Sequence, residues 1–245
     1  MFALRERRRG AAGPVDVAFT DRHGGVSRPP FDSLDLRGKD RARQAEFDAN
    51  AAIVADAFEV GGLVTMRQVH GKDVTVVGPV PHSGLEADAM VTMSPDVTLT
   101  VRVADCVPVV LADADQGVLG VAHAGRQGVA LGVISAAVAS MRELGAQDIH
   151  AWIGPHICGG CYEVPAEMRA EVTQVVPAAF ATTTWGTASL DLGAAVKAQL
   201  EQAACTFTAV DTCTRESPDL YSYRRDGERA GRFAGLIVLR GADGV

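Results

Sequence analysis

The sequence predicts an α+β fold in a single domain that spans residues 1–245. Short apolar strands follow one another in runs joined by turns, whereas a doubly wound fold would alternate strands strictly with helices. Helical spacing of apolar residues is confined to a few separate segments. The sequence shows no internal repeat, and its composition does not divide it into two domains.

Strands are expected where short apolar runs end in turn residues. In chain order these runs are 15–20, 63–69, 74–77, 89–92, 98–103, 107–112, 118–122, 149–153, 206–210 and 233–239. The run from Val74 to Val77 is expected to pair with Leu63 to Val69 in a hairpin. The last run, Phe233 to Leu239, is apolar throughout, which is typical of a central strand.

Helices are expected where apolar residues recur three or four positions apart. The first runs from Ala42 to Phe58 and ends before Gly61-Gly62, and the second runs from Gly128 to Leu144. A third begins at Pro165, and a fourth, from Leu192 to Ala204, follows the capping residue Asp191. Residues 1–14 are interpreted as a flexible, basic N-terminal arm.

The net charge of −7 argues against a nucleic-acid partner, because such proteins present excess positive charge. An odd number of cysteines, five, indicates reduced thiols and a cytoplasmic location. No secretory signal and no apolar run of membrane-spanning length is present, so no membrane partner is expected. We expect a monomer that acts on small molecules.

The stretch from Ala104 to Gly128 reads as two apolar strands joined by the turn Asp113 to Gly117. Cys106 precedes the middle of this turn by nine residues, and His123 follows it by eight. The two side chains are therefore expected nearly opposite each other at the open end of a hairpin. A register slip of one residue would place them on opposite faces.

His70 ends an apolar strand and precedes Gly71, so its imidazole is expected to point out of the end of the sheet. Together with Cys106 and His123 it would form a His2Cys set, which suits zinc and leaves a fourth position open. Asp105 could accept a hydrogen bond from a ligand histidine, move a proton, or only cap a strand end. From spacing alone, a buried thiol among packed histidines remains the alternative.

Three other motifs could carry chemistry. Cys158 and Cys161 form C-G-G-C, which we interpret as a glycine-rich turn rather than a redox or metal pair, because no matching pair exists. Arg126 begins the helix that follows His123 and could help to bind an anion there. The aromatic and basic segment Tyr221 to Arg225, which contains Arg224, could stack on a base and hold a phosphate, or could be a solvated turn.

An ordered series of motifs resembles one known family, the YfiH-like or laccase-domain proteins. The motifs are R-H-G-G-V-S (22–27), Q-V-H-G (68–71), A-D-A-M-V-T (87–92), A-D-C-V-P-V (104–109), A-H-A-G (122–125), I-G-P (153–155), Y-E-V (162–164) and Y-S-Y-R-R (221–225), followed by Gly231-Arg232. Members of this family are also called polyphenol oxidases, peptidoglycan-editing factors or purine nucleoside phosphorylases.

The resemblance implies four layers, α/β/β/α, with mixed β-sheets. It also implies a metal site made by His70, Cys106 and His123, which the hairpin argument had already brought together. The chain departs from the family pattern at Arg126 and Gln127, where the family has tryptophan and arginine, and at Asp35, where it has asparagine. The first departure removes a stacking surface and displaces a guanidinium by one position.

The function expected from this resemblance is that of a zinc-dependent purine nucleoside phosphorylase with adenosine deaminase activity. Adenosine, inosine, guanosine and methylthioadenosine are the expected substrates, with phosphate as the co-substrate. His70, Cys106, His123 and Asp105 are the candidate catalytic residues, and Arg126 or Arg224 would neutralise phosphate. One alternative is a metal-free hydrolase or amidase in which His123 activates Cys106, acting on peptidoglycan precursors.

Two further alternatives are a copper-dependent polyphenol oxidase and a binding module without catalytic activity. A multicopper cluster needs many histidines, and this chain has six, of which His82 and His150 look incidental. Copper nevertheless remains possible at the His2Cys set.

Overall fold

A computed structural model describes residues 1–38 and 43–241 and contains two six-stranded mixed sheets. The first sheet has the strand order β1-β2-β14-β7-β3-β5, and the second has the order β13-β10-β8-β9-β6-β4. The strands of the first sheet are β1 (Phe2–Gly10), β2 (Gly13–Thr20), β3 (Val64–Arg67), β5 (Leu85–Glu86), β7 (Leu99–Val103) and β14 (Phe233–Leu239). Those of the second are β4 (Val74–Val76), β6 (Ala89–Thr92), β8 (Val107–Asp113), β9 (Val118–Ala124), β10 (His150–Ile153) and β13 (Thr206–Ala209).

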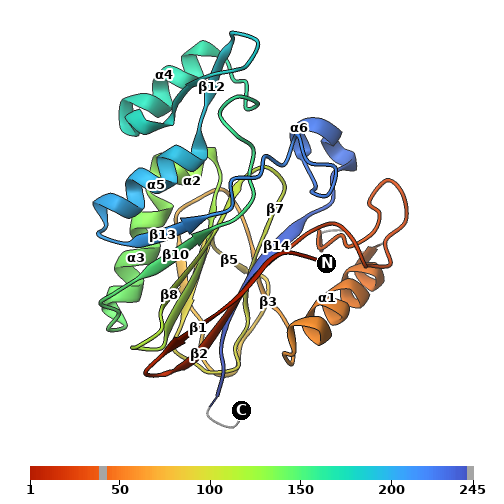
Figure 1. The fold of residues 1–245 in the computed structure, drawn as a ribbon, viewed down its shortest axis with the longest axis vertical. Helices are drawn as coiled ribbons and strands as arrows, with labels where there is room; N and C mark the ends of the chain where they lie inside the picture. The colour runs from red at the N-terminus through yellow and green to blue at the C-terminus, as the bar shows by residue number, and fades with distance from the viewer. Residues whose placement is uncertain (39–42, 242–245) are drawn as a thin grey trace.

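The helices are α1 (Gln44–Phe58), α2 (Arg126–Leu131), α3 (Val133–Glu143), α4 (Ala166–Val175), α5 (Leu192–Gln202) and α6 (Tyr223–Asp226). Helix α1 covers the outer face of the first sheet and α3 and α5 cover that of the second, whereas α4 and α6 lie beyond the ends of the strands (Figure 1). A small two-stranded sheet of β11 (Phe180–Thr182) and β12 (Ala188–Leu190) lies beside α4 (Figure 1). No described helix is long and apolar enough to cross a membrane.

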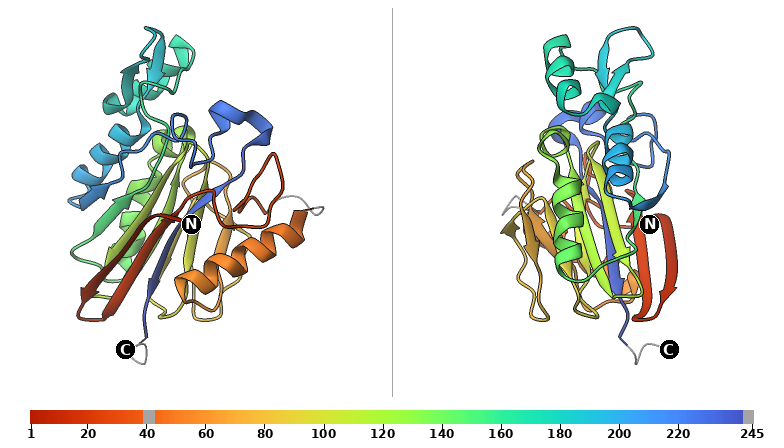
Figure 2. Two further views of the ribbon diagram at one scale, coloured as in Figure 1. Left: turned by 45° about the vertical axis from the view of Figure 1, so that its right-hand side comes forward. Right: turned by 90° about the vertical axis from the view of Figure 1, so that its left-hand side faces the viewer.

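Three apolar cores separate the four layers, which lie one behind another in Figure 2. One core packs α1 against the first sheet, and includes Phe58 and Leu236. The middle core joins the two sheets through residues such as Phe19 and Val110, and the third packs α3 and α5 against the second sheet. This arrangement is the expected α/β/β/α domain.

Most expected elements are present with small shifts at their ends. The strand β14 lies between β2 and β7, so the apolar run from Phe233 to Leu239 is central, as predicted. The first helix begins at Gln44, and Ala42, where the sequence placed its start, lies outside the described residues. The side chain of Asp191 accepts a hydrogen bond from the backbone N–H of Ala194 and so caps α5, as expected.

The N-terminal segment is not a flexible arm. Residues Phe2–Gly10 form β1, which pairs with β2 at the edge of the first sheet. The Arg7 guanidinium donates to the buried carboxylate of Asp16 at 2.5 and 2.8 Å, and Glu6 accepts from the indole N–H of Trp152 at 2.9 Å. Long cationic side chains on an edge strand resemble a solvated tail in the sequence, although they also protect an exposed sheet edge.

Two further expectations are corrected. The predicted helix from Gly128 to Leu144 is two helices, because Gly132 adopts a left-handed conformation (φ 84°) that ends α2 and precedes α3. The strand at Val74–Val76 does not form a hairpin with β3. It belongs to the second sheet, where it runs parallel to β6.

The chain crosses from the first sheet to the second three times at segments that contain polar motif residues. His70 lies between β3 and β4, Asp88 between β5 and β6, and Asp105 and Cys106 between β7 and β8. His70 (φ 64°) and Asp105 (φ 85°) both adopt the left-handed conformation, which is uncommon outside glycine. The crossings therefore collect chemically active side chains at one end of the two sheets.

Candidate metal centre and substrate cavity

His70, Cys106 and His123 come together although they lie far apart in the sequence. One potential ligand atom from each lies within 4.8 Å of the others. The Cys106 Sγ atom is 4.0 Å from His70 Nε2, and the two imidazole rings meet edge to face with centroids 4.8 Å apart. His123 is buried, Cys106 is half-buried and His70 is exposed, so the set opens to solvent on one side.

The register of the central hairpin explains how Cys106 and His123 share a face. Pro108 pairs with His123 and Val107 pairs with Ala124, so Cys106 lies across from Gly125. The offset from the predicted opposition is two residues, which keeps both side chains on the same side of the ribbon. A Cβ atom at Gly125 would stand 2.8 Å from the His70 ring and 3.2 Å from Cys106 Sγ. Glycine at this position therefore leaves the space in which the three side chains meet.

Asp88, which the sequence analysis did not single out, holds two of these residues in place. Its carboxylate lies 2.7 Å from His123 Nδ1 and accepts backbone N–H groups of Val69, His70 and Gly71 at 3.1, 3.0 and 2.6 Å. With Nδ1 engaged by a carboxylate, His123 presents Nε2 as its free ligand atom. The signal for Asp88 was its place directly before the strand that pairs with β9.

Asp105, which the sequence suggested as a hydrogen-bond acceptor for a ligand histidine, has other partners. Its carboxylate accepts a hydrogen bond from the Thr214 hydroxyl at 2.6 Å and from the backbone N–H of Arg224 at 2.5 Å. The backbone carbonyl of Asp105 also accepts the N–H of Ile157 at 3.0 Å. Asp105 therefore ties the end of β7 to the segment that leads into α6, beside the candidate ligand Cys106.

The thiol and the buried imidazole alter each other's proton affinity. Burial alone would raise the pKa of Cys106, but the charge and hydrogen bonding of His123, with a contribution from His70, lower it to about 6. Burial would lower the pKa of His123, but Cys106 and Asp88 raise it to about 9. A thiolate at neutral pH is the form of cysteine that binds metals and acts as a nucleophile.

A cavity of about 430 Å³ adjoins the three residues. Four arginines and two tyrosines contribute to its lining, namely Arg37, Arg102, Arg224, Arg232, Tyr162 and Tyr223. The Arg224 guanidinium lies over the Tyr162 ring at 4.9 Å, and that of Arg232 lies 5.9 Å from the centre of the Tyr223 ring. The volume is in the range of small-molecule sites.

None of these four arginines forms a direct ion pair with a carboxylate within the described part of the chain, although Asp35 and Asp105 lie close enough to raise the pKa of Arg232. Arg37, Arg102, Arg224 and Arg232 donate from their side chains to backbone carbonyl groups, and none forms an ion pair there. Burial and the nearby Arg232 lower the pKa of Arg102 to about 10, so it stays protonated at neutral pH. Burial and Arg37 likewise lower the pKa of Arg232. Like charges gathered in one cavity favour an anionic ligand.

Comparison with known proteins places the chain in a family. Residues 16–240 match the family model described as "Multi-copper polyphenol oxidoreductase laccase". The chain belongs to this family.

Two relatives and one solved structure extend over nearly the whole chain. A purine nucleoside phosphorylase of Streptomyces coelicolor is 49% identical over 232 residues, which cover 90% of this chain and 94% of the relative. One from Streptomyces griseus is 45% identical over 247 residues, covering 96% and 99%. The crystal structure of the hypothetical protein YfiH from Bacillus licheniformis superposes with a TM-score of 0.84 at 27% identity and covers 92% of this chain and 93% of that protein.

In this member of the laccase family, only two of the six histidines share a site. His23 bonds with Asp219, and His150 with the hydroxyl groups of Thr206 and Thr208. His156 contacts the carbonyl of Gly154, and His82 is exposed. Among the described residues, the histidines therefore suit one mononuclear centre and not a multicopper cluster.

The departure from the family pattern at Arg126 lies at the start of α2. This arginine is adjacent to the Tyr162 hydroxyl group, on whose pKa it acts, but it is not among the residues that line the cavity. Arg224 does line the cavity. Of the two arginines suggested by the sequence as phosphate ligands, the structure brings Arg224 to the site.

Proposed function

We propose that this protein is a zinc-dependent purine nucleoside phosphorylase that also deaminates adenosine. The observation that supports this most directly is a three-ligand metal set at the edge of a cavity whose arginines have no carboxylate partner within the described residues. A phosphorolytic site has to hold a phosphate anion beside a nucleoside, and this cavity offers positive charge and tyrosine rings together. The names of the relatives from both Streptomyces species agree with this activity.

The donor set fits zinc in the chemistry of its ligand atoms. His70, Cys106 and His123 provide two imidazoles and one thiolate, which zinc accepts in catalytic sites, and a fourth position stays free for a reactant. Asp88 fixes the tautomer of His123, as the outer partners of ligand histidines commonly do. A zinc ion bound there would act as a Lewis acid towards an oxygen nucleophile.

The remaining groups of the cavity would bind and orient the two substrates. The guanidinium groups of Arg102, Arg224 and Arg232 would hold phosphate, whose oxygen attacks the anomeric carbon of the ribose. The bond between this carbon and the purine nitrogen breaks, and the leaving base takes up the proton that the attacking phosphate gives up, which gives ribose 1-phosphate and a free purine. Tyr162 and Tyr223 provide faces on which a purine can stack.

Deamination would use the same cavity with water in place of phosphate. Water adds at C6 of adenosine, the C–N bond to the amino group breaks, and the products are inosine and ammonia. The substrate range we propose comprises adenosine, inosine, guanosine and methylthioadenosine, which share the purine ring and the ribose.

The deciding experiment incubates the zinc-loaded protein with adenosine and phosphate, and follows ribose 1-phosphate, adenine and inosine by chromatography. Cys106→Ala should abolish both product series, whereas Cys205→Ala, which changes a buried cysteine outside the site, should preserve them. Products that persist unchanged in the Cys106→Ala protein would remove the proposed site. A wild-type protein that stays inert after zinc loading would favour a binding module.

A metal-free hydrolase remains the second candidate, because Cys106 and His123 form a thiolate–imidazolium pair in which the cysteine could be the nucleophile. His70 separates the two proposals. A metal site loses its activity in His70→Ala and with chelators, whereas a Cys–His nucleophile pair keeps it under both conditions. Peptidoglycan precursors are the substrates to test for this second candidate.

A further inference from the structure

A second group of metal-binding side chains lies apart from the His70 set. One sulfur or oxygen atom from each of Cys158, Cys161, Cys213 and Glu216 lies within 4.8 Å of the others. Cys161 is buried, Cys158 and Cys213 are half-buried, and Glu216 is exposed. The C-G-G-C motif is therefore a turn, as the sequence predicts, but it is also joined by a third thiol that the sequence analysis did not associate with it.

Two backbone segments build this cluster. In the C-G-G-C turn, the N–H groups of Cys161 and Tyr162 both donate to the Cys158 carbonyl at 3.0 Å, which brings the two thiols to one side. Cys213 comes from the segment after β13, where it forms a single parallel bridge with His156. The Cys158 N–H points at Cys213 Sγ from 3.4 Å, as backbone N–H groups do around metal-bound sulfur.

The chemistry of the cluster matches a closed zinc site. Cys161 Sγ and Glu216 Oε1 are 3.4 Å apart. Tetrahedral zinc with Zn–S bonds of about 2.3 Å and Zn–O bonds of about 2.0–2.2 Å keeps neighbouring ligand atoms roughly 3.5–3.8 Å apart. Three thiolates and one carboxylate complete four coordination, so this site has no open position, unlike the His70 set.

A disulfide accounts for the cluster less well. A bond between any two of the three cysteines leaves the third thiol and the Glu216 carboxylate without a shared ligand, and the only positive side chain that acts on them among the described residues is that of Arg215, beside Cys161. All five cysteines of the chain are free in the structure. A divalent cation engages all four side chains at once.

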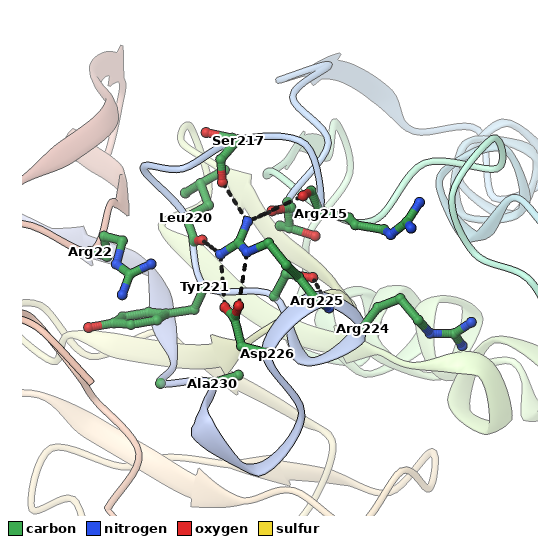
Figure 3. Close-up of polar contacts among 12 residues, drawn as sticks. Arg22, Arg215, Ser217, Leu220, Tyr221, Arg224, Arg225, Asp226 and Ala230 are labelled. Atoms are coloured by element: carbon green, nitrogen blue, oxygen red, sulfur yellow. Dashed lines mark hydrogen bonds and ion pairs between the residues drawn. The ribbon is translucent and has the colours of Figure 1, made fainter. Parts of the chain in front are cut away.

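The segment that follows Cys213 shows what such an ion would hold in place. The Arg225 guanidinium donates to the carbonyls of Thr214, Ser217 and Leu220 at 2.9, 2.8 and 2.7 Å, and pairs with Asp226 (Figure 3). Thr214, directly after Cys213, bonds to Asp105 beside the candidate metal ligand Cys106. The segment from Cys213 to Arg224 is thus held together by the hydrogen bonds of Arg225 and is attached to the cavity through Thr214. The cysteine cluster lies at its N-terminal end.

We propose that Cys158, Cys161, Cys213 and Glu216 bind a structural zinc ion that fastens the segment 213–224 to the turn after β10. This ion is separate from the one proposed at His70, Cys106 and His123, and it takes no part in the reaction. The proposal does not depend on the identity of the substrate.

The test uses the Cys106→Ala protein, because that substitution removes the only thiol of the His70 set. Bound zinc is first removed from this protein with a chelator and a reductant, and cobalt(II) is then added to the metal-free protein under anaerobic conditions. Thiolate coordination gives an intense sulfur-to-cobalt charge-transfer band in the near ultraviolet. We expect the Cys106→Ala protein to show this band with the intensity of three thiolate ligands. The band should disappear when one equivalent of zinc is added. Cys106→Ala/Cys213→Ser should lack the band, and Cys106→Ala/Cys205→Ser, the matched control, should keep it.

Metal content gives an independent readout. The wild-type protein should carry two equivalents of zinc, and Cys106→Ala or Cys213→Ser should each lose one. Absence of the charge-transfer band in Cys106→Ala would overturn the proposal, and that result does not require the Cys213 variant to fold. A disulfide among residues 158, 161 and 213 in freshly purified protein, detected by peptide mass spectrometry, would overturn it as well. Either result leaves the proposed phosphorylase activity to its own assay.

Discussion

The carboxylate of Asp88 lies 2.7 Å from Nδ1 of His123, and both side chains are buried. The same carboxylate accepts the backbone N–H groups on either side of His70, so one acidic residue orients two candidate ligands. Burial alone would raise the pKa of Asp88, but the hydrogen bonds from His123 and Gly71 hold it below its ordinary value. Asp88 is therefore ionised and can stabilise a metal-bound imidazole.

Substitution of Asp88 by asparagine should weaken zinc binding about 10- to 100-fold, as loss of an outer partner of a ligand histidine commonly does. The measurement is a competition titration against a chromophoric chelator on protein that retains its circular dichroism spectrum. Asp113→Asn is the matched control, because Asp113 is a buried carboxylate that accepts backbone N–H groups at the other end of β8. Equal zinc affinities in the two variants would refute this role for Asp88.

A methyl group at Gly125 should disturb the metal centre without disturbing the backbone. Gly125 has φ −77° and ψ 169°, which alanine adopts freely, but the added Cβ would stand 2.8 Å from the His70 ring. We expect Gly125→Ala to lower zinc affinity and phosphorolysis at least about tenfold, equivalent to about 1.4 kcal/mol. Gly78→Ala, where a Cβ meets no atom within 4 Å, should leave both unchanged. Wild-type zinc affinity in Gly125→Ala would show that the three side chains do not converge on one ion.

Loss of the Arg224 guanidinium should weaken phosphate binding more than binding of the nucleoside. Arg224→Met removes a charge-assisted contact of about 1.5–3 kcal/mol, so the KM for phosphate should rise roughly 10- to 100-fold. The KM for adenosine should change far less, and the rise for phosphate should shrink in high salt, because Arg224 is exposed. Arg126→Met, a change outside the cavity lining, is the comparison. Steady-state kinetics with each substrate varied in turn provides the values, and equal effects of the two variants on phosphate would contradict this assignment.

The sequence predicted the elements that apolar periodicity specifies, and β6 and β14 have the predicted limits. It did not show that the chain passes from one sheet to the other at His70, because two strands joined in a hairpin and two strands in different sheets have the same local sequence pattern. For the same reason the sequence analysis considered Asp105 and did not single out Asp88: both precede apolar strands, and only the order of strands decides which carboxylate faces His123. The sequence analysis did not associate Cys213 with the C-G-G-C motif, because Cys158 and Cys161 lie more than fifty residues earlier in the chain. Local patterns specify elements, whereas contacts between crossings depend on tertiary packing.

The last prediction concerns the edge strand β1, which the sequence analysis interpreted as a flexible arm. Asp16 is 2% exposed and pairs with Arg7 from β1 and with Arg240 at the end of β14. Burial alone would raise the pKa of Asp16, but hydrogen bonds from both arginines hold it below the ordinary value. A carboxyl group whose pKa is lowered by folding stabilises the folded state above its ordinary pKa, about 3.9, and this contribution disappears as the pH falls through the lowered value.

Asp16→Asn should therefore reduce the free energy of unfolding by about 3–5 kcal/mol at neutral pH, the cost of breaking a buried ion pair. Urea unfolding followed by circular dichroism at a series of pH values measures the difference between wild type and variant. That difference should be constant from neutral pH down to about pH 5, should shrink below about pH 4, where the unfolded chain takes up the proton, and should approach zero once the pH falls below the lowered pKa of the folded protein. A stability difference that persists undiminished in acid would mean that the Asp16 charge does not anchor β1 to the sheet.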